Sequence, residues 1–415
     1  MEPRNKEIIS EEIIGPDNLI SQENENAAAD EQTAAFCDEE NQETENKASF
    51  KDFFQEFFTR KFKIVCIAFL CALAVYILSR FIPAFAEFWT RYPAQGIRFI
   101  MAKLTGWIPF SVAECLILSL PVICAAYITA SMIATKRDES NYTFYKWIRP
   151  MVSLVLIIFT LFLSMFGPAY GRLRLSENLG IEQKDVSANE LVETATIISQ
   201  KVSAELESIN FDYSGASVLP YDYWELREKI NDAFDEYASG VDYVSHFDSN
   251  PKPIAVSEVM TYTHISGVYT FMTGEANINT NYPNFLMPFT MAHEMAHQRG
   301  IAREDEANFV AFLVCTGSDD AYIRYSGYAN MLNYMLTAIA NADVALYADF
   351  AVNVLPHDIA REFVAYSRFF DKYRESVASD ITGAVNNTFL QSQGQKEGTK
   401  SYGLVVDLAV AYYKQ

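Results

Sequence analysis

The sequence predicts an α+β fold that is mainly α-helical, with three transmembrane helices followed by a globular domain that contains a small β-sheet. Three observations support this prediction. Three long apolar stretches lie within the first 170 residues, helical periodicity of apolar residues dominates the rest, and one stretch near residue 270 is rich in Val, Thr, Tyr, Phe and Ile. At 415 residues, the chain is long enough for a membrane anchor and a domain with a sizeable core.

The first segment, residues 1–58, is strongly acidic. Residues 1–50 carry fourteen Asp and Glu against three Lys and Arg, a net charge of −11 within a chain total of −21. Because a segment with so few apolar residues cannot bury a core, we expect a disordered cytoplasmic tail. The negative charge also argues against nucleic acid as a partner, since a phosphate backbone would be repelled.

The second segment, residues 59–170, contains the three predicted spans. They are Ile64–Phe85, Trp107–Ile133 and Trp147–Ala169, each long and apolar enough to cross a lipid bilayer. Basic residues precede the first span and separate the second from the third, which favours a cytoplasmic N-terminus. Three spans then place the chain after Ala169 outside the cytoplasm. Four basic residues between the first two spans weaken this pattern, namely Arg80, Arg91, Arg98 and Lys103.

The third segment, residues 171–415, is expected to form the extracytoplasmic domain. Amphipathic helical patterns cover Glu190–Ile209 and Asp222–Tyr237, and helical patterns resume from Ala321. Between them, Val256–Asn279 has a strand pattern. Within it, Val268–Met272 is either an edge strand that pairs with an extended peptide or an ordinary hairpin strand.

The motif with the most chemical content is HExxH, formed by His293, Glu294 and His297. Histidines at i and i+4 share one helix face, so both imidazoles can reach one metal ion. Glu294 lies close enough to that face to touch a water bound to the metal, and zinc lowers the pKa of such a water. The alternative interpretation is a polar helix face on which two histidines happen to align. The apolar run before the motif is too short to span a membrane, and the charged motif itself belongs outside one.

A catalytic zinc ion usually has three protein ligands and one open position. Gly300 is spaced to end the first helix and to turn the chain back, and a second helical pattern begins near Arg303. On that helix Glu304 could supply the third ligand, and Asn308, four residues later, could hydrogen-bond a ligand. Glu306 is the competing candidate. Because residues two apart on a helix differ by about 200° in direction, only one of the two glutamates can serve, and we favour Glu304.

These residues resemble known metallopeptidase motifs. Glu304-Asp305-Glu306-Ala307-Asn308 is similar to the ExxxD element of the gluzincin metallopeptidases, whose first Glu is a zinc ligand, although Asn308 stands where that family has Asp. The metzincin pattern HExxHxxGxxH fails, because its third histidine is Arg303 here.

The stretch HEMAHQRGIAREDEANF resembles most an uncharacterised family of bacterial multi-pass membrane proteins regarded as zinc peptidases. Three further stretches extend this likeness over most of the chain after the first sixty residues, namely Gly106–Ser111, Gly267–Asn279 and Ser401–Tyr413. The resemblance implies a zincin-like domain and peptidase activity.

The leading hypothesis is therefore a membrane-anchored zinc metallopeptidase that hydrolyses a peptide or protein substrate outside the cytoplasm. His293, His297 and Glu304 would bind Zn²⁺, and Glu294 would act as the catalytic base. One alternative is a non-catalytic, zinc-dependent peptide-binding sensor or scaffold at the cell surface. Another is a hydrolase of cell-wall peptides.

Several other residues are weaker candidates for the site. His357 and Tyr402 are conceivable transition-state donors, but each is more typical of a plain surface or core residue. Glu275 and Asn277 could line the cleft or satisfy a turn. The remaining candidates are Cys315, more typical of a small core residue than of a ligand, and two histidines that no spacing joins to the motif, His246 and His264.

Overall fold

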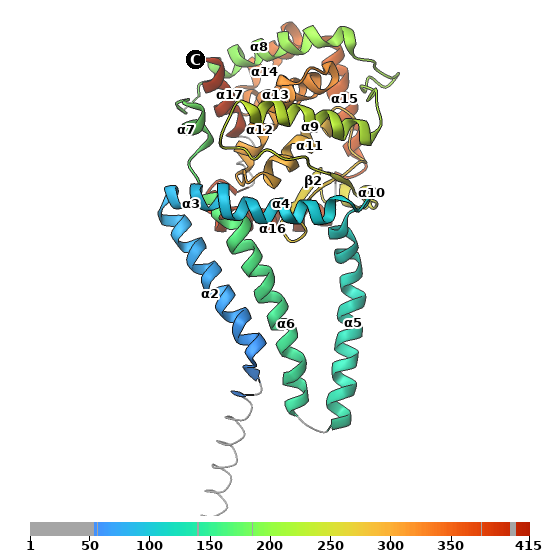
Figure 1. Cartoon of the computed structure of the whole chain (residues 1–415). Coiled ribbons are helices and arrows are strands. Elements are labelled where there is room, and N and C mark those ends of the chain that lie inside the picture. Colours follow the sequence, from blue (N-terminus) through green and yellow to red (C-terminus); the bar gives the residue numbers. More distant parts are fainter. Residues whose placement is uncertain (1–53, 56, 139–140, 185, 375, 399–403) are drawn as a thin grey trace, which may run out of the picture. The chain divides into compact units, whose positions relative to one another are not determined.

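The structure is a computed structural model that describes residues 54–55, 57–138, 141–184, 186–374, 376–398 and 404–415 (Figure 1). The predicted acidic tail, residues 1–58, lies almost entirely outside the described residues. The chain divides into two compact units. The smaller consists of Met1–Ile64 and Ser131–Met151. The larger consists of Val65–Ala130 and Val152–Gln415 and contains the HExxH motif.

Helices make up most of the described chain, and the strands form one small sheet, which confirms the predicted α+β class. The α-helices are α2 (Arg60–Phe81), α3 (Pro83–Trp89), α4 (Gln95–Gly106), α5 (Val112–Asp138), α6 (Asn141–Leu161), α7 (Leu175–Leu179), α8 (Ala188–Glu205), α9 (Tyr223–Ser239), α10 (Ser257–Thr261), α11 (Leu286–Gln298), α12 (Glu304–Gly317), α13 (Ala321–Ala342), α14 (Val344–Asn353), α15 (His357–Asp371), α16 (Val377–Ser392) and α17 (Val405–Tyr413). Short π or 3-10 turns are η1 (Thr90–Ala94), η2 (Phe162–Phe166), η3 (Gly167–Gly171) and η4 (Leu206–Ser208). The strands are β1 (Lys252–Pro253), β2 (Gly267–Thr270) and β3 (Glu275–Ile278).

Three helices in the described chain are long and apolar enough to cross a membrane, as the sequence predicts. They cover Arg60–Phe81, Val112–Arg137 and Lys146–Gly171. The first ends four residues before the predicted end because Pro83 opens a new helix and Ile82 before it is extended. A residue before proline is disfavoured in the helical region, so the break is local in origin. These helices associate the protein with a lipid bilayer.

The chain between α2 and α5 is helical, which the sequence analysis did not predict. It forms α3, the π turn η1 and α4, and its basic residues are engaged with neighbouring groups. Arg98 on α4 is 1% exposed and donates to the carbonyl groups of Met165 and Thr90 at 3.0 and 2.9 Å. Arg91 forms an ion pair with Glu87. Arg91 and Arg98, two of the basic residues that weaken the predicted charge pattern for topology, therefore make contacts within the larger unit.

The sheet has the strand order β1-β3-β2, so β2 lies at an edge. β3 pairs parallel with β1 and antiparallel with β2, where Gly267 lies opposite Ile278. The predicted strand Val268–Met272 is thus present as β2, although it ends at Thr270. The start of the predicted strand region is a helix instead. Residues Ser257–Thr261 form α10, and the amides of Ala255 and Val256 just before it donate to the carboxylate of Glu114.

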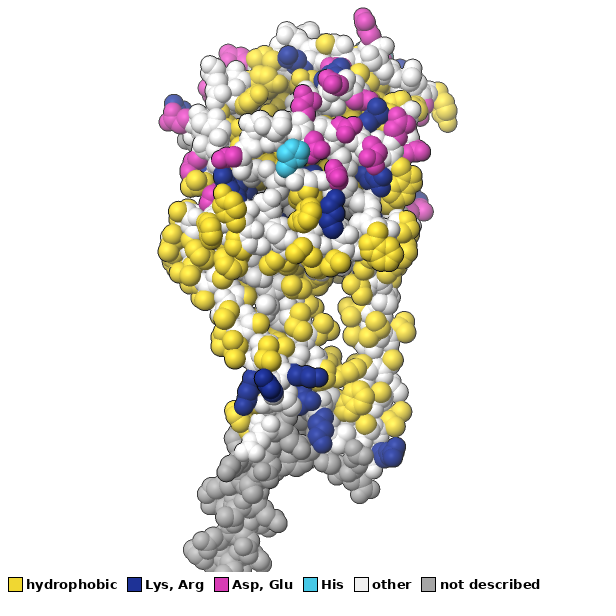
Figure 2. Space-filling model, viewed as in Figure 1, with side chains coloured by type: hydrophobic (Ala, Val, Ile, Leu, Met, Phe, Trp, Pro, Cys, Tyr) yellow, Lys and Arg dark blue, Asp and Glu magenta, His cyan; other side chains and the backbone are white. Residues whose placement is uncertain are grey.

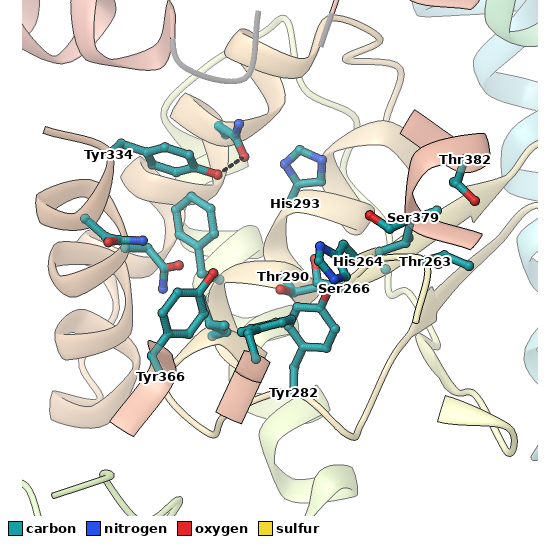
Figure 3. Close-up of a pocket in the computed structure, with 18 of the residues that line it drawn as sticks. Thr263, His264, Ser266, Tyr282, Thr290, His293, Tyr334, Tyr366, Ser379 and Thr382 are labelled. Carbon is teal, nitrogen blue, oxygen red and sulfur yellow. Dashed lines mark hydrogen bonds between the residues drawn. The ribbon is translucent and has the colours of Figure 1, made fainter. Parts of the chain in front are cut away.

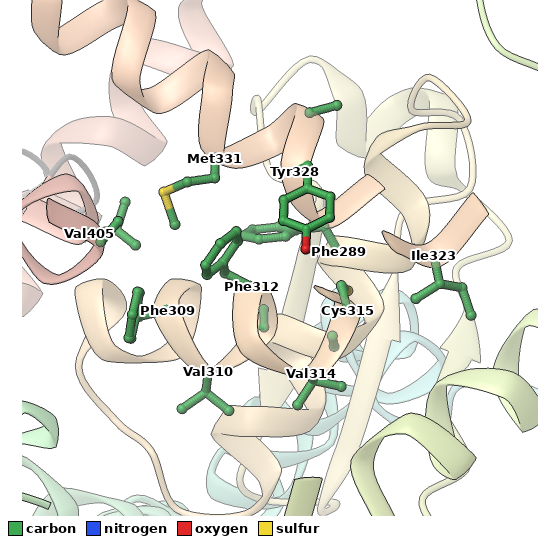
Figure 4. Packing of buried hydrophobic residues seen from close by; sticks show 14 of the residues in the cluster. Phe289, Phe309, Val310, Phe312, Val314, Cys315, Ile323, Tyr328, Met331 and Val405 are labelled. Carbon is green, nitrogen blue, oxygen red and sulfur yellow. The ribbon is translucent and has the colours of Figure 1, made fainter. Parts of the chain in front are cut away.

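The globular part packs around α11, α12 and α13. The predicted amphipathic helices are confirmed as α8, which begins with a capping box between Ser187 and Glu190, and α9, which Asp222 caps. Apolar side chains from these helices and from α17 form one large core cluster. Figure 4 shows part of it, with Phe309 and Phe312 of α12 beside Met331 of α13 and Val405 of α17. This core makes α11 and α12 a rigid support for the motif.

Candidate metal centre

The two motif helices are joined by a turn that the sequence predicts correctly. α11 ends with the hydrogen bonds of a Schellman motif, from the amide of Ile301 to the carbonyl of Ala296 and from Gly300 to His297. Gly300 has φ = +90°, a value that side chains disfavour. α12 then begins at Glu304, so its first carboxylate returns to the histidine face of α11.

His293, His297 and Glu304 meet at one point. Glu304 Oε2 lies 3.3 Å from His293 Nε2 and 3.4 Å from His297 Nε2, and the three ligand atoms all lie within 4.8 Å of one another. The two imidazole planes are nearly perpendicular, at 89°. Within the described part of the chain, this is the one cluster of His, Cys, Asp and Glu with metal-binding proximity.

The donor set and its spacing fit a zinc ion. Atoms bound to zinc at about 2.0–2.2 Å in tetrahedral geometry lie about 3.3–3.6 Å from each other. The observed separations from Glu304 fall in this range. Glu304 Oε2 lies close to both rings without a hydrogen bond of favourable direction to either. Two imidazole nitrogens and one carboxylate oxygen leave a fourth position open, as catalytic zinc sites do.

The tautomer of His297 suits metal binding. Its Nδ1 lies 2.7 Å from the carbonyl oxygen of Ile301. Because a carbonyl can only accept, Nδ1 donates to it, and Nε2 is the nitrogen that faces the cluster and could bind a metal ion. The Schellman turn that orients Glu304 therefore also orients His297.

The charges at the cluster are strongly coupled. Burial alone would raise the pKa of Glu304, but the two imidazoles hold it well below its usual range. Burial lowers the pKa of His297, and the Glu304 carboxylate outweighs it and raises that pKa to about 9. Each group thus stabilises the charged form of the other, and a divalent cation would take over the role of the imidazole protons.

Glu294 lies beside the cluster, against the edge strand β2. Burial raises the pKa of its carboxyl group, against the effect of His293 and His297. The backbone of Tyr269 hydrogen-bonds one side of the carboxylate, and Oε2 is buried with no hydrogen-bond partner. A Cβ atom at Gly267 would lie 2.7 Å from both Cγ and Oε1 of Glu294. Glycine at this position therefore lets the strand approach the glutamate closely.

The structure separates the two candidate third ligands as the helical geometry predicts. Glu304 faces the histidines, whereas Glu306 Oε1 accepts a hydrogen bond from the amide of Leu175 at 3.1 Å and lies 3.7 Å from Arg303. Asn308 is buried, and its Oδ1 lies 3.5 Å from the hydroxyl of Tyr334. The geometry thus brings together the four residues of the predicted site, which are His293, Glu294, His297 and Glu304.

A cleft of about 720 Å³ opens next to the cluster and is lined by His293 and Glu294 (Figure 3). Its walls come from segments far apart in the sequence, including the approach to β2, α13, α15 and α16. They carry mainly hydroxyl, amide and aromatic groups. The labelled wall residues in Figure 3 are Thr263, His264, Ser266, Tyr282, Thr290, Tyr334, Tyr366, Ser379 and Thr382.

The other residues that the sequence suggested for the site lie in different surroundings. His357 begins α15 with an 84% exposed side chain and is not among the cleft-lining residues, while Tyr402 lies outside the described residues. Cys315 is fully buried in the main core, where burial raises the pKa of its thiol. His264, which no spacing joined to the motif, does line the cleft.

Glu275 and Asn277 make structural contacts within the larger unit. Glu275 accepts hydrogen bonds from two amides of α5, and Asn277 donates to the carbonyl of Val268. Tyr334 and Tyr366 also line the cleft, and nothing in the sequence pattern singles out either residue as part of a site.

Fold and site together define a membrane-associated protein that carries a buried His–His–Glu cluster next to a cleft with both polar and aromatic walls. A model of the family described as "Protein of unknown function (DUF3810)" matches residues 90–410. The chain belongs to this family, which confirms the resemblance to an uncharacterised family. The description assigns no activity, so the peptidase part of that resemblance stays a prediction. No curated protein and no solved structure matches the chain.

Proposed function

We propose that the protein is a membrane-anchored, zinc-dependent peptidase. The observation that carries the proposal is the convergence of His293 Nε2, His297 Nε2 and Glu304 Oε2 at ligand–ligand distances, with Glu294 beside them. A zinc ion in this cluster would polarise a substrate carbonyl and lower the pKa of a water molecule in its open position.

Glu294 is the residue that would move the proton. It sits one position after His293, its Oε2 is not committed to any hydrogen bond, and it lines the cleft. It would take a proton from the attacking water as the C–O bond forms, and deliver that proton to the nitrogen of the departing amine as the peptide C–N bond then breaks. A pure binding module has no use for a carboxylate in this position.

The open edge of β2 supports a peptide as the substrate. The amide of Asn279 donates to the carbonyl of Ser266, so this pair is hydrogen-bonded across the ladder. Alternation along an antiparallel pair then directs the backbone groups of Gly267 and Tyr269 away from β3, and those of Tyr269 include the hydrogen bond to Glu294. Gly267 lines the cleft, and an extended peptide could add to the sheet there next to Glu294.

Tyr334 is the proposed donor to the carbonyl oxygen of the substrate. It lines the cleft from α13, and its hydroxyl lies near Asn308 on the helix that carries Glu304 (Figure 3). Burial raises the pKa of its phenol, which therefore keeps its proton and remains a hydrogen-bond donor. A donor aimed at a developing oxyanion contributes about 3–4 kcal/mol to transition-state stabilisation.

The decisive experiment compares the wild-type protein with Glu294→Gln after purification in detergent and zinc loading. Both should bind about one zinc ion per chain, because the ligands are intact. Only the wild type should cleave a library of quenched fluorescent peptides. Bound zinc without cleavage by either protein would favour the sensor hypothesis, and bound zinc with equal cleavage would exclude Glu294 as the base. Purified cell-wall peptides in the same assay test the remaining alternative.

We further propose that the N-terminus is cytoplasmic and the cleft extracytoplasmic. Arg60, Lys61 and Lys63 at the start of α2, with Lys136 and Arg137 at the end of α5, support this orientation. A protease added to intact cells should degrade epitopes after Gly171 and spare an epitope tag at the N-terminus. The reverse pattern would overturn this topology.

A further inference from the structure

Helix α16 has two faces of opposite character. Ser379, Thr382 and Asn386 line the cleft. On another face, Ile381 and Val385 are 61% and 65% exposed, and Val377 one turn earlier is more exposed still. Aligned β-branched residues at i, i+4 and i+8 form an apolar stripe that an ordinary water-facing helix lacks. α16 is therefore a wall of the cleft whose outward face is apolar.

The C-terminal end of α16 is attached to the ends of two membrane helices. Arg80, in the last turn of α2, donates to the carbonyl of Gln393 at 2.7 Å, and Tyr76 donates to the Gln393 side chain at 3.1 Å. The ring of Phe389 packs 5.9 Å from Phe162 in the third span. A helix of 22 residues is about 33 Å long, close to the roughly 30 Å of bilayer hydrocarbon. The attachment therefore lies at the hydrocarbon boundary.

Helix α4 presents a second apolar surface at the same end of the domain. Ile100 and Leu104 are exposed, Trp107 just after the helix is 80% exposed, and Arg98 and Ala102 on the opposite face are buried. Thr105 contacts the carbonyl of Thr273 in the turn between β2 and β3. Figure 1 shows α4 lying across the span ends with α16 at the same level, and Figure 2 shows apolar side chains gathered there and acidic ones over the rest of the domain.

We propose that α4 and α16 lie in the interfacial layer of the bilayer, so that the cleft opens at the membrane surface and takes a membrane-held polypeptide cut close to its anchor. Amphipathic helices with exposed Trp, Phe and Leu bind this layer. The continuity of α16 with two spans favours lipid over a soluble partner. The substrate part of this inference rests on the proposed peptidase function, whereas the placement of the two helices does not.

The placement is tested by photo-crosslinking of the full-length protein in phospholipid nanodiscs. A benzophenone amino acid replaces Ile381 or Val385, with Leu118 in the second span as positive control and Val352 on α14 as an exposed apolar negative control. Phospholipid adducts should form at 381, 385 and 118 and be at least several-fold rarer at 352. Adducts at 118 alone, or crosslinks of 381 and 385 to a second copy of the chain, would overturn the placement.

The substrate class is tested with one randomised quenched peptide library, used free or attached to the nanodisc by a palmitoyl group. The anchored library should be cleaved at least tenfold faster at equal bulk concentration. Equal rates would overturn the membrane-held substrate. Cleavage of neither library in a zinc-loaded protein would instead overturn the proposed peptidase function, and the lipid adducts would still decide the placement.

A matched pair of variants separates binding at the interface from chemistry. Ile381→Ser with Val385→Ser changes only the outward face of α16 and should slow cleavage of the anchored library while leaving that of the free library unchanged. Val344→Ser with Val352→Ser, on α14, removes as much exposed apolar surface and should affect neither. Equal loss for both libraries in the α16 variant would show a structural defect of the cleft and would contradict the proposed role of this face.

Discussion

The carboxylate of Glu275 accepts one hydrogen bond from the backbone amide of Ala113 at 2.9 Å and another from that of Val112 at 3.1 Å. Glu275 lies in β3, next to the edge strand of the cleft, and the two amides open the first turn of α5. These amides have no partner within their own helix, and an anion at a helix N-terminus is also favoured by the helix dipole. One buried side chain thus fixes the sheet to the second span.

Replacement of Glu275 by alanine should therefore destabilise the protein by about 1–3 kcal/mol, because two buried donors would lose their acceptor. The measurement is the thermal unfolding midpoint in detergent or nanodiscs. Glu193→Ala, at an exposed position on α8, is the control and should be nearly neutral. An unchanged midpoint for Glu275→Ala would show that water replaces the carboxylate without loss.

Glu304→Ala and Glu306→Ala should differ in zinc binding. Loss of Glu304 removes a ligand atom and should reduce bound zinc to a small fraction of the wild-type amount. Loss of Glu306 removes an acceptor for Leu175 and should lower stability while leaving the metal in place. Metal content by mass spectrometry and folding by circular dichroism check both. If Glu306→Ala lost the metal and Glu304→Ala kept it, the proposed ligand set would be wrong.

Gly267→Ala should impair hydrolysis without removing zinc. A Cβ atom at this position overlaps Glu294 at 2.7 Å, so the glutamate must move from its place beside the cluster. A displacement of about 1 Å can reduce a rate by about 100-fold. Gly317→Ala is the matched control, because no atom lies within 4 Å of its added Cβ. Full activity in Gly267→Ala would place the productive position of Glu294 elsewhere.

Tyr334→Phe should lower kcat by about 100- to 1,000-fold with little change in KM or in zinc content, since the hydroxyl would act on the transition state. Tyr366→Phe removes a hydroxyl from another tyrosine that lines the cleft and serves as the control. A change confined to KM would assign Tyr334 to substrate binding instead.

The contribution of Glu87 to stability should depend on pH. Burial raises the pKa of this carboxyl group, but Arg172 and Arg91 outweigh it, so the net pKa in the folded state lies below its ordinary value of 4.5. A lowered pKa stabilises the fold above pH 4.5, and that stability is lost as the pH falls through the folded value. Glu87→Gln should thus be less stable than wild type at pH 7 and approach it towards pH 3. A constant difference across this range would contradict the role of the charge.

The sequence predicts best what is local. HExxH, the turn at Gly300 and the different directions of Glu304 and Glu306 all follow from helical spacing within about fifteen residues, and the structure places these residues accordingly. The spans follow from hydrophobic runs, with errors of a few residues at prolines. In contrast, His264 and Tyr334 reach the cleft only through packing between distant segments, which no spacing encodes. α4 escaped prediction because its buried face contains Arg98, whose charge is satisfied by carbonyl groups from η1 and η2.

The turn at Gly300 is supported by residues from the part of the chain that carries the apolar helices. Arg172 donates to the carbonyl of Gly300 at 3.0 Å, and the guanidinium group of Arg98 fills the space where a Cβ of residue 300 would lie. Arg172 directly follows the third apolar helix, and Arg98 lies between the first two. We therefore expect that a fragment beginning after Arg172 would lack both supports, and that the loop between α11 and α12 would be less well ordered in it.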